Sequence, residues 1–318
     1  MKDINIIIPV YHSRKTLGRA LMSLADQLYK EFKVTIVQDG DGEDYTDIVE
    51  QYRGYGLEIN VMPLEENVGP GLARQAGMDA DNESKYFILL DSDDLILPYG
   101  VESLYRGMEN NKLDILTSSF IRHGQKENAM QDVQTSAITW CAGKIYLAKY
   151  LKENNIRFHP TLRLNEDSYF NVVAWNSTPK RGQLNEATFL MMDNGDSLTR
   201  QNGLKGFFLK GWNQYIISQV EGMKEIYRQT LHLEPRIAGR TLVYLYNECM
   251  IARHYGLDTS EAKYNLHKLN VQWFKKIMDM QDFWKEIEGC LRGCQVYDKE
   301  LVFFDYSFGE WLKWILEE

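Results

Sequence analysis

The sequence of 318 residues predicts an α/β protein with a mostly parallel sheet flanked by helices, followed by a helical C-terminal region. Two patterns predict this fold. In about the first 120 residues, short continuous apolar runs alternate with segments whose apolar residues recur every three or four positions. Such strand–helix–strand repeats favour parallel pairing, because each crossover helix covers a face of the sheet. After residue 203, apolar and aromatic residues recur at helical spacing only, and we expect about five helices there.

Continuous apolar runs that end in polar or glycine-rich clusters are typical of strands buried on both faces. The predicted strands cover residues 4–10, 32–37, 57–62, 86–90 and 113–117. The predicted helices between them cover residues 14–28, 44–53 and 69–80, with a fourth that starts at Pro98. Pro70 suits the first turn of the third helix, because a residue there needs no free N–H.

The segment after the fifth predicted strand is less regular. Residues 118–138 are polar and weakly patterned, which indicates a loop or an irregular hairpin. Residues 144–153 and 166–175 are predicted helices, and residues 188–192 a short strand followed by a turn at 193–196. We divide the chain into a catalytic domain, residues 1–202, and a helical domain, residues 203–318, for acceptor binding or oligomerisation.

Charge and composition narrow the classes of function. The net charge is −9, and residues 1–200 contribute most of it, with 21 Lys and Arg against 29 Asp and Glu. Such a surface repels a polyanion unless cations intervene, and it suits a site where metal holds a phosphate. No run of about 18 apolar residues occurs, so we expect no membrane-spanning helix and a cytoplasmic location. The cysteines lack the spacing of metal sites, and we expect reduced thiols.

An acidic turn, Asp91-Ser92-Asp93-Asp94, directly follows the predicted strand 86–90. Ligands of open α/β sheets bind at the carboxyl ends of the strands, where this turn lies. Adjacent carboxylates repel one another, and a bound hard cation such as Mg²⁺ or Mn²⁺ removes that repulsion. Its ligands would be one or two of these carboxylates together with substrate phosphates. The alternative interpretation is an acidic turn that caps the next helix.

Two further segments lie at the same predicted edge. Asp39 follows the second strand, where a carboxylate could accept hydrogen bonds from a nucleobase or a ribose, although it also fits an ordinary Asp-Gly turn. The segment from Asn67 through Gly69 to Arg74 opens a helix whose N-terminal N–H groups favour anions. Arg74 could pair with a phosphate or with an acid of the cluster.

Glu166 and Asp167 start a predicted helix, where paired acids usually stabilise the helix dipole. A metal and nucleotide site gives them a second interpretation, as the source of a general base. Neither a Walker A motif nor GxGxxG occurs, which disfavours phosphate-loop NTPases and dinucleotide-dependent dehydrogenases.

Together, these motifs resemble those of family 2 glycosyltransferases, which have the GT-A fold. The similarity covers about residues 3–200. It comprises five ordered segments: residues 5–11 with Val37-Gln38-Asp39-Gly40, residues 67–77, Leu90-Asp91-Ser92-Asp93-Asp94 as the DxD motif, Trp140 with Lys144 and Tyr146, and Glu166 to Phe170.

The resemblance implies inverting transfer of a sugar from a nucleotide sugar, usually a UDP-sugar, with Mn²⁺ or Mg²⁺. Carried onto this sequence, it places the nucleoside at Pro9, Val10, Tyr11 and Asp39. It places the rest of the nucleotide-sugar site at Asn67, Gly69, Arg74, Asp91, Ser92 and Lys144. Asp93 and Asp91 would bind the metal, and Glu166 and Asp167 are the catalytic pair, with Asp167 as the base.

The sequence departs from the family pattern in two places. Asn194 lies about where many members have a His, which puts a third metal ligand or phosphate contact in question. Asp193 or Asp196 is a candidate to replace that ligand, but a plain turn is the favoured interpretation of this segment. Gln38 stands where an acid often precedes Asp39. Two other hypotheses stay open: a nucleotidyltransferase acting on sugar phosphates, and a non-catalytic binding or assembly module. No pattern identifies the acceptor, whether glycan, lipid-linked, protein or nucleic acid, and self-association through the C-terminal helices is an expectation.

Overall fold

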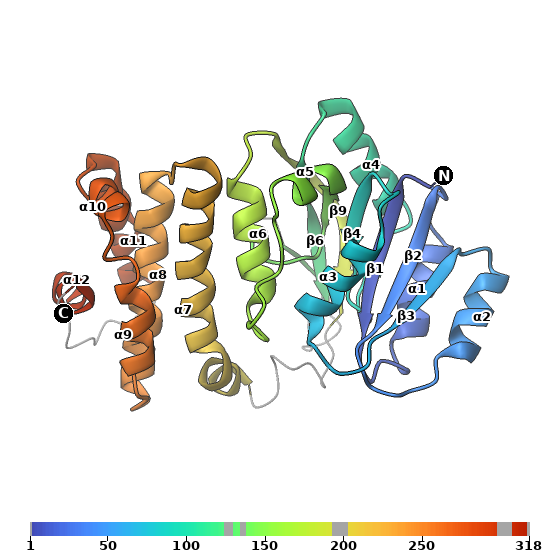
Figure 1. The fold of residues 1–318 in the computed structure, drawn as a ribbon, viewed down its shortest axis with the longest axis horizontal. Helices are drawn as coiled ribbons and strands as arrows, with labels where there is room; N and C mark the ends of the chain where they lie inside the picture. The colour runs from blue at the N-terminus through green and yellow to red at the C-terminus, as the bar shows by residue number, and fades with distance from the viewer. Residues whose placement is uncertain (1, 124–129, 134–137, 193–202, 298–306, 317–318) are drawn as a thin grey trace. The chain divides into compact units, whose positions relative to one another are not determined.

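The computed structural model describes residues 2–123, 130–133, 138–192, 203–297 and 307–316. The chain divides into two compact units, residues 1–197 and 198–318, and each is described by itself (Figure 1). Within these described ranges, no helix has both the length and the apolar composition needed to cross a bilayer.

The first unit is built on one mixed sheet. Its described strands follow the order β3-β2-β1-β4-β8-β6-β9-β5, with β7 paired to β6. They are β1 (Ile4–Val10), β2 (Phe32–Gln38), β3 (Ile59–Pro63), β4 (Tyr86–Leu89), β5 (Leu95–Ile96), β6 (Ile115–His123), β7 (Met130–Val133), β8 (Lys144–Leu147) and β9 (Arg181–Met191).

The four strands β3, β2, β1 and β4 pair in parallel and therefore end at one edge. All seven residues of β1 are buried, as the continuous apolar run predicts. The other half is mixed: β8 lies antiparallel between β4 and β6, whereas β6 and β9 are parallel. The predicted α/β fold with a mostly parallel sheet is confirmed, and the parallel half places four strand ends side by side.

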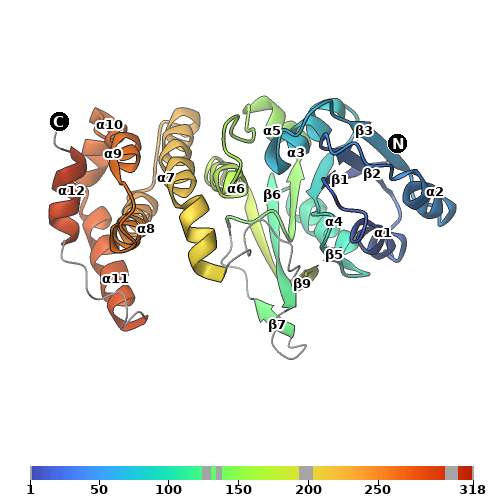
Figure 2. The same ribbon diagram turned by 90° about the horizontal axis from the view of Figure 1, so that it is seen from below.

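Helices cover both faces of the sheet (Figures 1 and 2). In the two views, α1 and α4 lie on one face and α3 and α6 on the other. The helices of this unit are α1 (Leu17–Ala25), α2 (Thr46–Gly54), α3 (Pro70–Ala80), α4 (Gly100–Asn111), α5 (Ala148–Glu153) and α6 (Glu166–Asn176). Alternate residues of β1 share the core of α1, α2 and α4, namely Ile4, Ile6, Ile8 and Val10. On the other face, a Cβ at Gly77 of α3 would lie 2.7 Å from Cγ2 of Ile7, so glycine lets α3 approach the sheet closely.

Several predicted elements differ from the structure. The helix predicted at residues 144–153 is wrong in its first four residues, which form β8, and the helix begins only at Ala148. Lys144–Leu147 pairs with β4 and β6 and fills a gap in the sheet, so distant pairing overrides local helical spacing. The hairpin alternative for residues 118–138 is confirmed in β6 and β7, and β9 extends the predicted strand 188–192 backwards to Arg181.

The second unit is helical, with six described helices instead of about five. They are α7 (Gly203–Thr230), α8 (Pro235–His254), α9 (Ser260–His267), α10 (Gln272–Met278), α11 (Gln281–Tyr297) and α12 (Phe308–Leu316). Aromatic side chains form part of its core: the ring of Tyr246 lies 5.5 Å from Phe308 and 5.6 Å from Trp311, which is fully buried. The predicted turn at 193–196, with Asn194, lies outside the described residues.

Candidate active site

In the acidic turn after β4, the carboxylate of Asp91 is exposed, whereas other groups are held by hydrogen bonds. The side chain of Asp91 is 45% exposed, whereas Asp94 is buried and accepts a hydrogen bond of 2.9 Å from the N–H of Met192. The backbone carbonyl of Asp93 accepts a hydrogen bond from Arg19. Asp94 therefore fixes the turn against the end of β9, while Asp91 faces solvent.

Arg74 of α3 brings Asp91 together with Glu166, which begins α6. Its guanidinium forms an ion pair with Asp91 through Nη2 and lies 3.2 Å from Oε1 of Glu166 through Nη1. Burial opposes the charged form of Arg74, but Asp91 and Glu166 hold its pKa well above the usual value. Residues 92 positions apart in the sequence thus meet at one charged cluster.

Asp167 lies next to this cluster and differs from Asp91 in its environment. Burial, reinforced by the neighbouring charge of Glu166 and opposed by Arg74, raises the pKa of Asp167 to about 7. The pKa of Glu166 is also raised by its own burial. A carboxylate with a pKa near neutrality can hold or release a proton at physiological pH, as a general base requires.

A hydrogen-bond network supports the helix turn that carries Asp167. The Nδ2 group of the fully buried Asn171 donates to the carbonyl of Asp167 and to the carbonyl of Thr139. Its Oδ1 accepts a hydrogen bond of 2.6 Å from the Tyr146 hydroxyl. Lys144 is 1% exposed and donates to the carbonyl of Trp140, and burial lowers its pKa to about 8, although Cys141 and Asp167 oppose that shift. Asn171 thus anchors the first turn of α6 from the interior, and Lys144 is buried close enough for its charge to interact with Asp167.

Asp39 connects β2 to the loop before α3. It is 2% exposed, and its two carboxylate oxygens accept hydrogen bonds from the N–H groups of Val68 (2.7 Å) and Gly69 (2.9 Å). Gly40 has φ +66°, and a Cβ there would lie 2.3 Å from the carbonyl carbon of Glu66, so glycine is required at this crossing. The Asp39-Gly40 pair holds the loop that contains the exposed Asn67.

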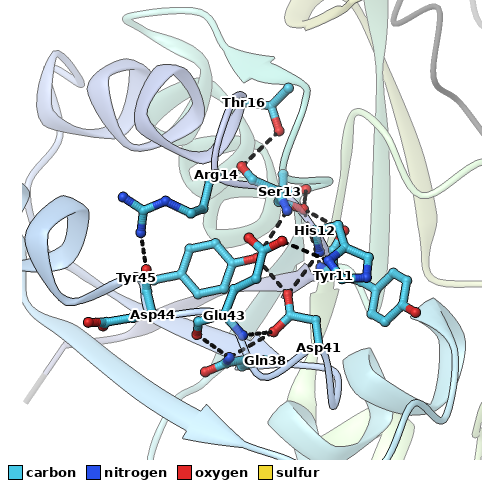
Figure 3. Close-up of polar contacts among 11 residues, drawn as sticks. Tyr11, His12, Ser13, Arg14, Thr16, Gln38, Asp41, Glu43, Asp44 and Tyr45 are labelled. Carbon is cyan, nitrogen blue, oxygen red and sulfur yellow. Dashed lines mark hydrogen bonds and ion pairs between the residues drawn. The ribbon is translucent and has the colours of Figure 1, made fainter.

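The loop after β1 joins the same edge (Figure 3). Pro9 and Val10 are buried, whereas the ring of Tyr11 is 48% exposed. Ser13 receives a hydrogen bond of 2.8 Å from Ser92 in the acidic turn, and its N–H donates to the Tyr45 hydroxyl. Sequence inspection missed Ser13 and Tyr45, because single hydroxyls in loops carry no pattern.

Asp41 is the centre of the network drawn in Figure 3. It accepts hydrogen bonds from the Tyr45 hydroxyl, the Gln38 side chain and the N–H groups of His12 and Glu43. Partial burial acts in the opposite direction, but these hydrogen bonds lower the pKa of Asp41. His12, Asp41 and Glu43 bring three possible metal-ligand atoms close together, yet Asp41 already serves four donors and His12 pairs with Glu43 at 2.7 Å. We interpret the trio as a loop support.

The acidic turn fits a divalent cation in a different way. Among the described residues, Asp91 and Asp93 belong to no compact group of three ligand atoms. The exposed oxygens of Asp91 nevertheless suit a hard cation that takes one or two carboxylates and completes its shell with substrate phosphates and water. The third-ligand candidates Asp193 and Asp196 lie outside the described residues.

The structure brings together most of the predicted site. Arg74 contacts both Asp91 and Glu166, and Asp167 is the residue after Glu166. Tyr11, Asp39 and Ser92 lie on the loops after the parallel strands β1, β2 and β4, at the same sheet edge. Trp140 is partly buried, with its ring 5.4 Å from Phe120, which favours a packing role.

The family is shown by sequence comparison. Residues 5–172 match the model described as Glycosyl transferase family 2, so the chain belongs to this family. It is 27% identical over 203 residues to the poly(ribitol-phosphate) beta-N-acetylglucosaminyltransferase TarS of Staphylococcus aureus, covering 59% of this chain and 35% of TarS. It is 24% identical over 224 residues to the glycosyltransferase GlyA of Streptococcus pneumoniae, covering 62% of this chain and 31% of GlyA. The chain thus spans about a third of the length of these two relatives.

Solved structures confirm the fold. A crystal structure of S. aureus TarS residues 1–349 with UDP has a TM-score of 0.67 at 22% identity, covering 95% of this chain and 88% of that one. The mannosyltransferase PcManGT of Pyrobaculum calidifontis, in complex with GDP-Man and Mn²⁺, has a TM-score of 0.55 at 10% identity, covering 94% and 88%. The resemblance inferred from the five motifs is therefore confirmed at the level of family and fold.

Proposed function

We propose that this chain is an inverting, metal-dependent glycosyltransferase that moves a sugar from a nucleotide sugar, a UDP-sugar, to an acceptor hydroxyl. The observation that carries the proposal is the cluster of Asp91, Arg74 and Glu166 beside Asp167, at the carboxyl ends of parallel strands. It places an exposed acid for the donor next to a partly buried acid of raised pKa for the acceptor. The UDP complex of the structural relative TarS supports a uridine donor.

In this proposal the nucleoside lies along the loops after β1 and β2. Tyr11 offers an exposed aromatic face to the base, and Pro9 and Val10 form the buried floor beneath it. Each carboxylate oxygen of Asp39 accepts one described hydrogen bond and has a further lone pair for a ligand. Because Asp39 is buried, only a ligand group that reaches into the loop can bind it. Asn67 and Gly69 supply the other wall, and Ser92 links the acidic turn to Ser13.

Asp91 and Asp93 would hold Mn²⁺ or Mg²⁺ together with the diphosphate. Such a cation, when bound, stabilises the charge that develops on the leaving nucleoside diphosphate. The acid-rich surface of residues 1–200 would otherwise repel that product. Arg74 adds positive charge to the same wall while it remains bound to both acids.

Asp167 would act as the general base. The acceptor oxygen forms a bond to the anomeric carbon as the bond from that carbon to the diphosphate oxygen breaks, and the acceptor proton passes to a carboxylate oxygen of Asp167. Attack from the face opposite the diphosphate inverts the anomeric configuration. A positioned base of this kind is typically worth about 10²–10⁴-fold in rate.

We also propose that residues 1–202 form the catalytic domain and that residues 203–318 bind the acceptor or mediate self-association. The second unit exposes aromatic side chains of the kind that contact sugars or subunits, namely Tyr244, Tyr255, Tyr264 and Trp284. Light scattering on the full chain tests self-association. A mass equal to one chain across a concentration series would leave acceptor binding as the role of this unit.

The direct test is slow donor hydrolysis, which needs no acceptor. UDP-N-acetylglucosamine, UDP-glucose, UDP-galactose and GDP-mannose are each incubated with protein and Mn²⁺, and nucleotide release is measured. We expect one UDP-sugar to be hydrolysed, and Asp167→Asn to reduce its turnover by about 10³-fold while UDP still binds. No hydrolysis of any donor, or full activity in Asp167→Asn, would contradict the proposal.

A further inference from the structure

Arg74 is a buried arginine that joins the donor side and the acceptor side of the proposed site. Its side chain is 5% exposed, and one arm of the guanidinium binds Asp91 while the other lies 3.2 Å from Glu166. Asp91 belongs to the turn after β4, and Glu166 is the first residue of α6, directly before Asp167. One rigid planar group therefore spans both halves.

The surroundings of Arg74 restrict its movement. Phe158 lies against it, with the guanidinium carbon 5.9 Å from the ring centroid, and the same ring stacks on Phe170 of α6 at 4.2 Å. A Cβ at Gly71 of α3 would lie 2.6 Å from Cγ of Glu166, so the first turn of α6 packs directly on α3. The guanidinium is thus held between two helices that approach each other through a glycine.

Stability alone gives a weak reason for this arrangement. A buried ion pair is often no more stabilising than apolar residues of the same volume, since desolvation offsets the attraction. The Nε atom of Arg74 is buried and has no hydrogen-bond partner among the described residues, which adds to that desolvation. The two acids that Arg74 does bind are the ones that flank the reacting groups of the proposed mechanism.

We infer that Arg74 is a positioning residue that couples donor binding at Asp91 to the alignment of Asp167, acting through Glu166 and the first turn of α6. The inference rests on the proposed function. A donor that engages Asp91 fixes one arm of the guanidinium, and the other arm then fixes Glu166. A displacement of about 1 Å at a reacting group can reduce turnover by about 10²-fold, so this alignment bears on kcat.

The test combines two conservative variants with readouts of coupling. Arg74→Lys keeps the positive charge but loses the two-armed geometry, and Glu166→Gln keeps the shape but loses the charge. Hydrolysis of the preferred UDP-sugar with Mn²⁺ gives kcat and KM. Hydrogen–deuterium exchange of residues 163–176, with and without UDP and Mn²⁺, shows whether α6 responds to occupation of the donor side.

We expect UDP with Mn²⁺ to slow exchange in α6 of the native protein, and each variant to lose most of that response. We expect kcat to fall by about 10²-fold, with KM changed by less than about threefold. The double variant should be little worse than either single variant, because both remove one connection. Glu166→Gln alone keeps the test decisive if Arg74→Lys does not fold.

A second ion pair, between α3 and the loop before α6, provides a matched control. Arg157, in the segment that precedes α6, binds Asp79 of α3 through two hydrogen bonds of 3.0 and 2.5 Å, and both side chains are nearly half exposed. Arg157→Lys and Asp79→Asn should leave the exchange response and kcat as in the native protein.

Three results would overturn the inference. If Arg74→Lys has an unchanged kcat and a full exchange response, Arg74 does not position α6. A raised KM with unchanged kcat would make Arg74 a direct donor contact. Equal effects in the Arg157 control would reduce both pairs to structural tethers. If the native protein does not bind UDP, the proposed function itself is wrong. This measurement is made before any variant, so the two failures are distinguishable.

Discussion

The two compact units use charged residues in different ways. In the first unit, Arg74, Glu166 and Lys144 are almost completely buried, and Arg74 forms an ion pair with Glu166. In the second, the ion pairs Arg228–Glu225 and Arg240–Glu286 each include a partner that is more than half exposed. Exposed pairs contribute little to stability, whereas buried charges are costly unless they are closely matched. The comparison supports the proposal that the chemistry lies in the first unit.

The largest effect that would sharpen this comparison is expected at Asp93. Asp93→Ala should lower nucleotide-sugar hydrolysis by about 10²-fold and abolish its dependence on Mn²⁺, because the cation loses a ligand. Asp47→Ala is the control, since that acid is exposed on α2 and binds Arg14. UDP release measured across a Mn²⁺ titration checks both variants. An Asp93 variant with the native Mn²⁺ response would show that the acidic turn only caps the next helix.

The second test concerns the raised pKa of Asp167, which burial and Glu166 move to about 7. The base must be deprotonated to accept a proton, so kcat/KM for hydrolysis should fall about tenfold per pH unit below that value and level off above it. The expected profile is measured from about pH 5 to 9 at saturating Mn²⁺. A flat profile between pH 5.5 and 8 would show that Asp167 does not titrate in the rate-limiting step.

A third, smaller effect is expected at Gly71, where α3, which carries Arg74, packs against α6, which carries Glu166. Gly71→Ala places a methyl group 2.6 Å from Glu166 Cγ and 3.0 Å from Phe158 Cδ1. We expect a loss of about 1–3 kcal/mol in the free energy of unfolding and about tenfold in turnover. Gly54→Ala is the matched control, because apart from its chain neighbours and its own helix backbone no atom lies within 4 Å of its Cβ position. Thermal unfolding and hydrolysis are measured for both variants. Equal stability and equal turnover in the two would show that the packing of α3 on α6 does not affect the site.

The smallest effect should come from the second unit, at Glu248 of α8. Burial raises its pKa to about 7 from an ordinary value of 4.5, so its charged form is penalised only when the protein is folded. The stability contribution of this group therefore falls as pH rises from 4.5 towards 7. Glu248→Gln should increase the free energy of unfolding by about 1–2 kcal/mol at pH 8, with no change near pH 4.5 and none in UDP binding. Changed UDP binding would break the division of roles between the units.

The sequence predicted most of the elements that position the site, because strong local signals coincide with the fold. The apolar run of β1, Pro70 at the start of α3 and the acids after β4 each identify a strand or helix end. Lys144 was misplaced on a helix because its strand is defined by pairing with β4 and β6, which no local pattern encodes.

The contacts within the site were less predictable. The helix position of Arg74 predicts a pair with a phosphate or with an acid of the turn, but its simultaneous contact with Glu166 depends on chain segments that meet only after folding. The hydrogen bond between Ser92 and Ser13 and the central place of Asp41 also arise from loop packing. Short-range periodicity predicts elements, whereas the geometry between elements requires the folded structure.

The most direct test of the central claim is calorimetric titration of UDP into the full chain, with and without Mn²⁺. The account predicts binding that strengthens with Mn²⁺ and is lost in the double variant Asp91→Ala/Asp93→Ala, while the control Asp47→Ala binds as the native chain does. Absence of UDP binding, or an affinity for UDP that changes neither with Mn²⁺ nor with the loss of both acids, would contradict this account.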